Sequence, residues 1–330
     1  MSKYIRIAVS VVLLSVIAWR TNWGEVGAKF ANLNYGLWFG AVVIALLIQL
    51  ACAMRWQIFA RELQFQHTLM QYNAFYLIGM YFNLLLPTSV GGDVMRVWYL
   101  DGASGRKLAA FASVALERLN GLLILIAMAC VGVLISPVPL PMWITASVWS
   151  IAGVAVLGSA ALLFLRGIDK LPANLRQQLQ TVLEIMRVPR VIAGATLASI
   201  LVQVLGVGCL WCLGGSLGLE VPVAYYCILG PMVALLTLLP ISVNGMGVRE
   251  FGTYLFLAEL SVNESTSNTF AFLWFATSVA VSLLGGLVYL FGAYPKAQTT
   301  NTPDDKGVDN HGSIDRDTDQ GRAREHHKAA

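Results

Sequence analysis

Charged residues are scarce in this sequence of 330 residues. Asp, Glu, Lys and Arg make up 12% of the chain and hydrophobic residues 57%, whereas about 25% of the residues in a soluble domain are charged. This composition excludes a water-soluble fold, which could not bury so much apolar surface. The charge is also uneven, since residues 296–330 contain six Lys or Arg and seven Asp or Glu. Residues 1–295 are therefore interpreted as an all-α polytopic membrane domain, and residues 296–330 as a disordered polar tail.

Cysteine and histidine are also few, and their positions argue against metal and disulfide chemistry. The five cysteines lie inside apolar runs, so no disulfide framework is expected. Cys209 and Cys212 form a C-x-x-C pair without a second pair of ligands, which favours packed helix residues over a zinc or redox site. Three of the four histidines fall in the tail, which leaves His67. We expect no metal, no cofactor and no nucleic-acid partner.

About six stretches are predicted to cross the bilayer as helices, because about 20 apolar residues span it. The first, 7–19, follows Lys3 and Arg6 and has no A-x-A-like cleavage site, so it is interpreted as a signal anchor. Positive residues collect on the cytoplasmic side, which places the basic segments 100–118 and 166–190 there. We also expect a cytoplasmic N-terminus, from the signal anchor, and a cytoplasmic C-terminal tail, although the balanced charge of the tail does not itself indicate a side. The remaining spans are predicted at 37–54, 119–136, 142–165, 191–213 and 270–291.

Two further apolar regions are predicted to enter the membrane and return to the same side. If residues 69–88 crossed completely, both basic segments would lie outside, so we expect a re-entrant cytoplasmic hairpin near 69–108. A second hairpin, entering from outside, is predicted near 221–259 because this region repeats the first. Inverted repeats with broken helices occur in secondary transporters. We therefore expect inverted-topology repeats, each with a re-entrant helical hairpin.

The repeat is visible in the letters of the sequence. Residues 85–96 read LLPTSVGGDVMR and residues 238–250 read LLPISVNGMGVRE, so the two share Leu-Leu-Pro-x-Ser-Val-x-Gly and a following arginine. Pro87 and Pro240 are predicted to end the incoming half-helices, and the glycines permit positive φ and close backbone approach. Each following half-helix would direct its free N–H groups and positive dipole end into a shared cavity. With Arg96 and Arg249 nearby, this pattern predicts a site for an anion, best suited to a phosphate.

The cost of membrane-embedded charge favours a functional site. Each such residue costs about 2.5–3.5 kcal/mol, so Asp93, Arg96, Arg249 and Glu250 represent on the order of 10 kcal/mol before pairing. The alternative is that Asp93 pairs with Arg96, and Glu250 with Arg249, only to neutralise the turns.

Two groups of nearby polar residues also leave alternatives open. Glu117 and Arg118 are either an interfacial pair that opens the next helix or part of the cavity wall. Asn83, Ser89, Ser242 and Asn244 either bind a headgroup or only satisfy freed backbone groups.

The motifs LLPTSVGGDVMRVWYL, AAFASVALERLNGL and LLPISVNGMGVREFG resemble the lysylphosphatidylglycerol synthase transmembrane-region family of flippase-like integral membrane proteins. The resemblance covers most of residues 1–295 and implies a multi-pass lipid-translocating module of the bacterial inner membrane, similar to the flippase portion of the multiple peptide resistance factor. The chain departs from the family at Pro-Thr-Ser-Val, where many members have Pro-Gly-Gly, and it lacks their soluble aminoacyl-transferase domain. The substrate-binding residues expected from motif and resemblance are Ser89, Gly91, Gly92, Asp93, Arg96, Glu117, Arg118, Ser242, Asn244, Gly245, Gly247, Arg249 and Glu250.

Three functional hypotheses follow. The first is a non-enzymatic flippase for an anionic or polyisoprenoid-phosphate-linked membrane lipid, not driven by ATP because no G-x-x-x-x-G-K-[ST] phosphate loop is present. The second is a membrane-embedded transferase acting on a lipid-phosphate carrier, although the body has no Asp-x-Asp or histidine-based constellation. The third is a non-catalytic partner of a glycosyl- or aminoacyl-transferase. The sequence does not determine the lipid, the direction of transport or the oligomeric state.

Overall fold

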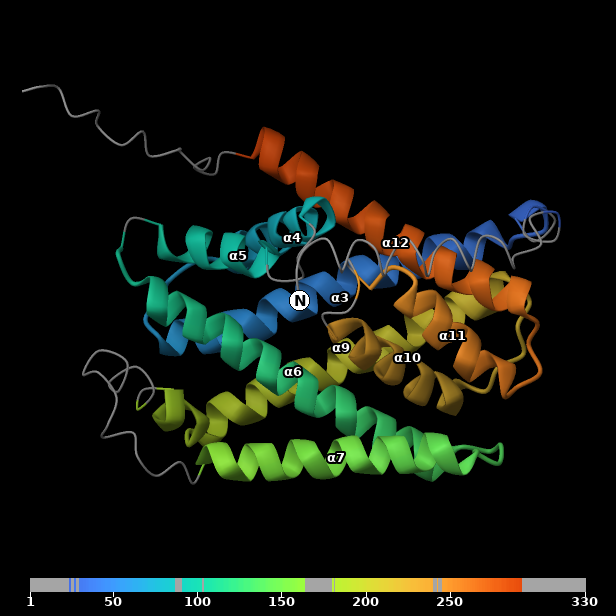
Figure 1. Ribbon diagram of the computed structural model, residues 1–330. Coiled ribbons are helices and arrows are strands. Elements are labelled where there is room, and N and C mark those ends of the chain that lie inside the picture. The colour runs from blue at the N-terminus through green and yellow to red at the C-terminus, as the bar shows by residue number, and fades with distance from the viewer. Residues whose placement is uncertain are drawn as a thin grey trace, which may run out of the picture. The chain divides into compact units, whose positions relative to one another are not determined.

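The fold is helical throughout the part of the chain that the structure describes. The computed structural model describes residues 24, 27, 30–86, 91–102, 104–163, 180, 182–239, 242 and 245–292, and within them it contains no strand (Figure 1). The helices are α3 (Tyr35–Glu62), α4 (Leu69–Leu85), α5 (Gly91–Asp101), α6 (Lys107–Ile135), α7 (Met142–Leu163), α9 (Pro189–Ser216), α10 (Val223–Leu238), α11 (Val248–Ala258) and α12 (Glu264–Phe291).

Five of these helices are long and apolar enough to cross a bilayer: α3, α6, α7, α9 and α12. They coincide with five of the six spans predicted from the sequence, so the prediction of an all-α, multi-pass membrane protein is confirmed for the described residues. The predicted signal anchor at 7–19 and the tail at 296–330 lie outside those residues. So do Pro87, Ser89, Pro240 and Asn244.

Side chains at the helix starts explain several of the element boundaries. Thr68 and Gln71 form a capping box at the start of α4, in which the Thr68 N–H donates to Gln71 Oε1 at 2.8 Å. Asn34 Oδ1 accepts from Leu37 N at the start of α3, and Asn263 Oδ1 accepts from Thr266 N at the start of α12. These caps satisfy backbone donors that the first helical turn cannot.

The remaining four helices form two pairs, each with a break between its members. The α4–α5 break lies within the first repeated motif, and the α10–α11 break lies within the second. In each pair the two helices pack against each other, and Figure 1 shows the two pairs approaching the middle of the helix bundle from opposite ends. The breaks therefore fall where the repeated sequence predicts them.

Glycines allow the first pair to pack closely on its neighbours. A side chain added at Gly92 of α5 would collide with the Gly79 carbonyl and with Asn83 of α4. A side chain added at Gly285 of α12 would collide with the Leu77 carbonyl of α4. Small residues at helix crossings let backbones approach in membrane proteins. Helix α4 therefore packs closely against both α5 and α12, with backbone contact at Gly79 and Leu77.

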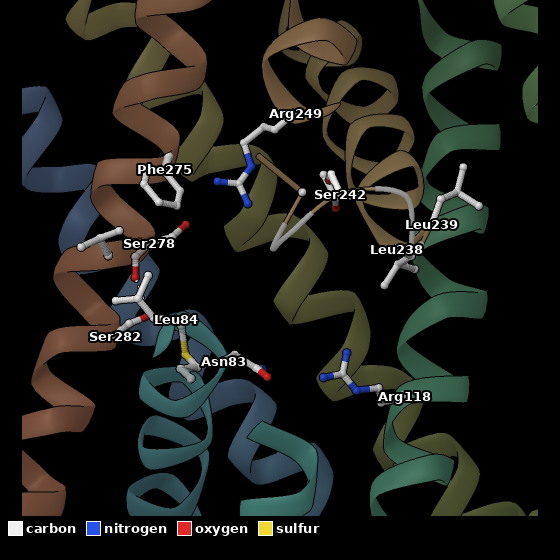
Figure 2. Close-up of a pocket in the computed structure, with 14 residues that line it drawn as sticks. Asn83, Leu84, Arg118, Leu238, Leu239, Ser242, Arg249, Phe275, Ser278 and Ser282 are labelled. Atoms are coloured by element: carbon white, nitrogen blue, oxygen red, sulfur yellow. Dashed lines mark hydrogen bonds between the residues drawn. The ribbon is translucent and has the colours of Figure 1, made fainter. Parts of the chain in front are cut away.

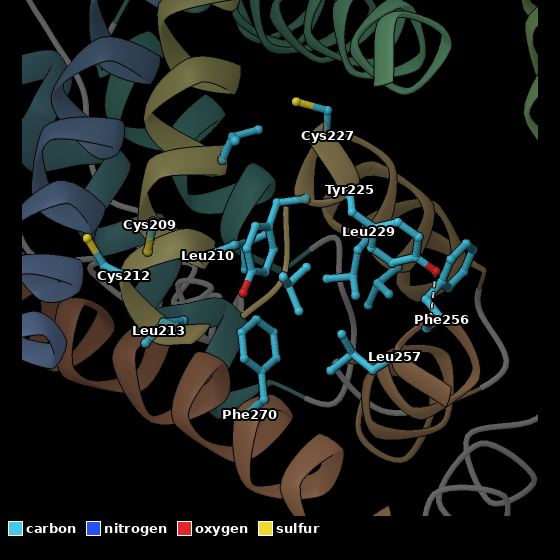
Figure 3. Close-up of a cluster of buried hydrophobic side chains, with 14 of the residues drawn as sticks. Cys209, Leu210, Cys212, Leu213, Tyr225, Cys227, Leu229, Phe256, Leu257 and Phe270 are labelled. Carbon is cyan, nitrogen blue, oxygen red and sulfur yellow. Dashed lines mark hydrogen bonds between the residues drawn. The ribbon is translucent and has the colours of Figure 1, made fainter. Parts of the chain in front are cut away.

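Two hydrophobic clusters hold the helices together. One lies between α3, α4, α5 and α6, where Trp56, Tyr72, Phe75 and Tyr99 are buried. The other joins α9, α10, α11 and α12, and Figure 3 shows Tyr225, Phe256 and Phe270 within it. In this second cluster the Tyr225 hydroxyl donates to the Phe256 carbonyl at 2.6 Å and so ties α10 to α11. Each helix break is thus supported by its own cluster.

Cys209 and Cys212 lie on α9 in this second cluster and are buried, free thiols. The Cys209 thiol is 3.5 Å from the Ala41 carbonyl of α3, along the packed α3–α9 interface. Groups of three or more His, Cys, Asp or Glu side chains arranged to hold a metal ion are absent from the residues that the structure describes. Both cysteine side chains are packed in the interior of the second cluster.

Candidate functional site

A cavity of about 340 Å³ lies between the two helix breaks. The end of α4 and the middle of α6 contribute to one side, and the α10–α11 break, α11 and α12 contribute to the other (Figure 2). Its polar lining residues, together with Gly245, come from the end of α4 just before the first repeated motif, from α6, from the end of α10 and the second repeated motif, and from α12. They are Asn83, Arg118, Thr237, Ser242, Gly245, Arg249, Ser278 and Ser282.

Arg249 brings a full positive charge to this cavity. Its guanidinium carbon lies 5.6 Å from the ring centre of Trp274 and 5.5 Å from that of Phe275, both on α12. These are cation–π distances. Across the described parts of the chain, no carboxylate lies within ion-pair distance of this guanidinium. Arg249 therefore has a charge that aromatic faces stabilise only in part and that an anion in the cavity would neutralise.

Arg118 brings a second guanidinium from α6, and Figure 2 shows it directed into the same space as that of Arg249. Its Nε lies 2.7 Å from Asp93 Oδ2 and its Nη2 lies 2.8 Å from Asp93 Oδ1. The carboxylate of Asp93 therefore binds two nitrogens of the guanidinium at once. Because 46% of the Arg118 side chain is exposed, the group still reaches the cavity.

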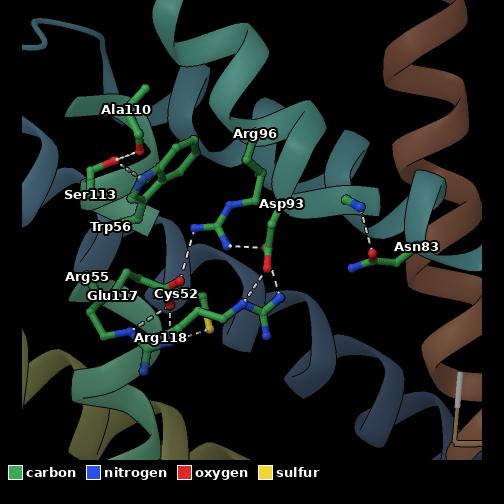
Figure 4. Close-up of polar contacts among 11 residues, drawn as sticks. Cys52, Arg55, Trp56, Asn83, Asp93, Arg96, Ala110, Ser113, Glu117 and Arg118 are labelled. Carbon is green, nitrogen blue, oxygen red and sulfur yellow. Dashed lines mark hydrogen bonds and ion pairs between the residues drawn. The ribbon is translucent and has the colours of Figure 1, made fainter. Parts of the chain in front are cut away.

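Behind Arg118 the pairing continues into the protein as a chain of alternating charges (Figure 4). Asp93 also accepts from Arg96 Nη1 at 3.3 Å, and Arg96 Nη2 donates to Glu117 Oε2 at 3.1 Å. The other oxygen of Glu117 accepts from Arg55 Nε at 2.9 Å. We call these five residues, Arg55, Glu117, Arg96, Asp93 and Arg118, the ionic chain. With three arginines and two carboxylates, it carries one uncompensated positive charge.

Arg96 itself does not line the cavity, although the motif predicted a role for it there. Only 3% of its side chain is exposed, and its guanidinium lies between the rings of Trp56 and Tyr76, at 4.3 and 4.2 Å from their centres. The pairing of Asp93 with Arg96, which the sequence left open as an alternative, is present. The aromatic faces and the two carboxylates account for the charge of Arg96, so it orients Asp93 and Glu117 from inside the protein.

Glu117 and Arg118 do not open a helix. α6 begins at Lys107, so these residues lie about 15 Å farther along its axis at 1.5 Å per residue. Glu117 is 1% exposed and belongs to the ionic chain, whereas Arg118 lines the cavity. Of the two alternatives left open by the sequence, the structure therefore places Arg118 in the cavity wall.

One backbone donor at each of the two helix starts is engaged by a side chain. The Gly92 N–H donates to Asn83 Oδ1 at 2.7 Å, and the Gly247 N–H donates to Glu250 Oε2 at 2.6 Å. Glu250 therefore caps its own helix and, within the described residues, forms no ion pair with Arg249. The positive φ values of Gly245 and Gly247, 72° and 81°, allow the turn that brings this cap together. The positive charge at the cavity comes chiefly from the two arginines.

Ser242 is the polar residue of the second break whose placement is described. It is 9% exposed and its hydroxyl has no hydrogen-bond partner among the described residues, yet it lines the cavity. A buried hydroxyl without a partner carries a desolvation cost of about 1–3 kcal/mol. A ligand oxygen in the cavity would remove that cost.

Several positions in and behind the cavity, Thr237 among them, were not anticipated from the sequence. Arg55 is the buried end of the ionic chain and also donates to Ser199 Oγ at 3.1 Å. On α12, Ser278 and Ser282 line the cavity. The four-residue spacing of these serines within an apolar span is a signal that could have revealed a polar helix face. The pairing of Arg55 with a glutamate 62 residues away has no such local signal.

The comparison with family models provides the decisive observation on identity. The model described as lysylphosphatidylglycerol synthase TM region matches residues 4–286. The chain belongs to this family. Comparisons with curated proteins and with solved structures returned no match. As a member of the lysylphosphatidylglycerol synthase transmembrane-region family with five membrane-spanning helices in its described part, the protein is a multi-pass membrane protein consistent with a lipid-related role.

Proposed function

We propose that the protein is a flippase for an anionic or polyisoprenoid-phosphate-linked lipid and binds the headgroup phosphate in the cavity between the two helix breaks. The observation that carries the proposal is the unpaired guanidinium of Arg249, facing the same cavity as Arg118. Guanidinium groups bind phosphate through charge-assisted hydrogen bonds. The free hydroxyl of Ser242 supplies a further donor.

The size of the cavity supports binding of a headgroup alone. Its volume of about 340 Å³ is near the lower end of small-ligand sites, which range over about 300–1,000 Å³. That space accommodates a phosphate and a small polar substituent, but not two acyl chains as well. The lipid tails would therefore remain in the bilayer while the phosphate passes the two arginines.

The dimensions of the paired helices support re-entrant hairpins. The longest of the four, α4, has 17 residues and is about 26 Å long at 1.5 Å per residue, which is shorter than the bilayer core of about 30 Å. Broken backbone at membrane depth is tolerated where it lines a cavity. We infer that α4–α5 and α10–α11 enter from opposite sides as inverted repeats. The N-terminus and the tail would then be cytoplasmic, in a bacterial inner membrane.

A transport assay in proteoliposomes tests this function. The purified protein is reconstituted into phosphatidylcholine vesicles with a trace of fluorescently labelled phosphatidylglycerol or labelled undecaprenyl phosphate, and the fraction of label accessible to an external quencher is followed over time. Wild-type protein should accelerate transbilayer movement of at least one of these lipids. The double variant R118Q/R249Q should lose the acceleration, whereas R190Q, which alters an exposed arginine at the start of α9, should retain it.

Three outcomes would overturn the proposal. No acceleration of either lipid by correctly folded wild-type protein would argue against a flippase. Formation of a lipid product on addition of a sugar-nucleotide donor would indicate a membrane-embedded transferase instead. If R118Q/R249Q kept the cellular phenotype of the wild type while inserting normally, the protein would act as a partner of another enzyme.

A further inference from the structure

The two arginines of the cavity differ in what already binds them. Among the described residues Arg249 has aromatic rings but no ion-pair partner beside its guanidinium, whereas Arg118 makes a two-point contact with the carboxylate of Asp93. A carboxylate bound through both oxygens to Nε and Nη2 occupies the same edge of the guanidinium that a phosphate would use for two parallel hydrogen bonds. The site therefore contains an internal anion before any ligand arrives.

We propose that Asp93 is an internal competitor for the headgroup phosphate and thereby sets the affinity and anion selectivity of the site. This inference rests on the proposed function, because it concerns the same cavity. A phosphate that enters binds first to the unpaired charge of Arg249. It then displaces the Asp93 carboxylate from Arg118 and is held by both arginines, one from each side of the cavity.

The displaced carboxylate of Asp93 has a second ion-pair partner. Asp93 keeps a second partner, Arg96 Nη1 at 3.3 Å, when Arg118 leaves it. Arg96 is fixed by the rings of Trp56 and Tyr76 and by Glu117, so Asp93 stays paired in both states. A buried carboxylate left without a partner would be costly. The exchange therefore moves one ion pair without exposing an unpaired charge.

Differences in exposure determine which arginine can move. The side chain of Arg118 is 46% exposed, whereas that of Arg96 is 3% exposed. Asp93 is 17% exposed and is not among the cavity-lining residues, so it acts on the ligand only through Arg118. Asp93 is thus a positioning residue. Its ion pair with Arg118 prevents weakly binding anions from reaching this guanidinium, whereas a phosphate replaces Asp93.

The direction in which substitution of Asp93 changes the affinity for phosphate distinguishes this role from others. If Asp93 competes with the ligand, D93N should bind phosphate more tightly than the wild type, by about tenfold for the loss of a charge-assisted two-point contact. A residue needed to bind the ligand, or needed for folding, would weaken binding when changed. R118Q should weaken phosphate binding. The double variant D93N/R118Q should bind phosphate as weakly as R118Q does, because Asp93 and the phosphate compete for the Arg118 guanidinium, which is absent from both variants.

Binding is measured by calorimetry on the full-length protein in detergent, with sn-glycerol 3-phosphate in one arm and dioctanoyl phosphatidylglycerol in the other. Tighter binding in both arms identifies the phosphate as the competing group; a gain confined to the lipid arm identifies a membrane headgroup as its source. An unchanged or weaker affinity of D93N in both arms would overturn the proposal.

A second measurement uses the wild-type chain and therefore does not depend on the folding of D93N. The Arg118 Nε–H resonance, assigned by its absence from R118K, should shift when sn-glycerol 3-phosphate is added, and no shift would count against the exchange. Absence of lipid transport together with tighter binding by D93N would refute the flippase but not the competition. Lipid transport by the wild type together with an unaltered phosphate affinity of D93N would support the flippase and refute the competition by Asp93.

Discussion

Arg55 of α3 and Glu117 of α6 form an ion pair in which Arg55 Nε lies 2.9 Å from Glu117 Oε1, although 62 residues separate them in the chain. Both side chains are almost completely buried, at 7% and 1% exposure. Glu117 also forms an ion pair with Arg96, which in turn pairs with Asp93 beside the cavity residue Arg118. The pair therefore joins the packing of the helix bundle to the position of the charges in the site.

Loss of Arg55 should destabilise the protein strongly. R55M would leave Glu117 with one of its two arginines, and breaking a buried ion pair by removing one partner costs about 3–5 kcal/mol. R61M is the matched control, because Arg61 lies on the same helix but is exposed; it should cost less than about 0.5 kcal/mol. Thermal and chemical unfolding in detergent compares the two. Equal stability of R55M and R61M would show that the ionic chain does not support the fold.

Substitution of Arg249 should reduce lipid transport without destabilising the protein. Since its guanidinium has aromatic neighbours but no ion-pair partner among the described residues, R249Q leaves no carboxylate unpaired. We expect at least a tenfold fall in the transport rate, equivalent to about 1.4 kcal/mol, with unfolding close to that of the wild type. R249K should retain part of the rate because it keeps the charge. A loss of folding in R249Q equal to the loss of transport would contradict this separation.

The turn at the second helix break should depend on glycine. Gly247 has a φ of 81° and donates its N–H to Glu250, so G247A would place a side chain in a conformation that costs on the order of 1–3 kcal/mol. G208A on α9 is the control, because an added methyl group there meets no atom within 4 Å. Unfolding measurements should show a loss for G247A and none for G208A. A stable G247A that transports lipid normally would show that the turn tolerates other geometries.

Two unpartnered hydroxyls allow a test of whether the cavity binds an anion. Ser242 lines the cavity, whereas Thr253 of α11 is 0% exposed and is not among the lining residues. S242A should weaken binding of sn-glycerol 3-phosphate about three- to tenfold, as expected for a net hydrogen bond of roughly 1 kcal/mol. T253V should leave binding unchanged and hold or raise stability. Equal binding by both variants would place the phosphate away from Ser242.

Local patterns in the sequence were sufficient for the helices and for the position of the breaks. The apolar stretches predicted five spans that the structure contains, because length and hydropathy are properties of a continuous segment. The two Leu-Leu-Pro-x-Ser-Val-x-Gly motifs predicted the breaks after α4 and α10. The sequence left pairing of Asp93 with Arg96 open as an alternative to a ligand site, and the structure contains that pair, since residues three apart on a helix are neighbours.

Tertiary packing alone decided which charges face the cavity. Arg96 and Arg249 occupy equivalent positions in the two motifs. In the structure, however, Arg96 is enclosed by Trp56, Tyr76 and two carboxylates. Arg249 has no ion-pair partner among the described residues. Arg55, and the serines of α12, enter the site through contacts between distant segments. The strength of a charge depends on its neighbours and its exposure to solvent, and both are set by how helices cross. The amino-acid sequence therefore determined where the helices break. The packing of those helices determined which arginine of the cavity has no ion-pair partner among the described residues.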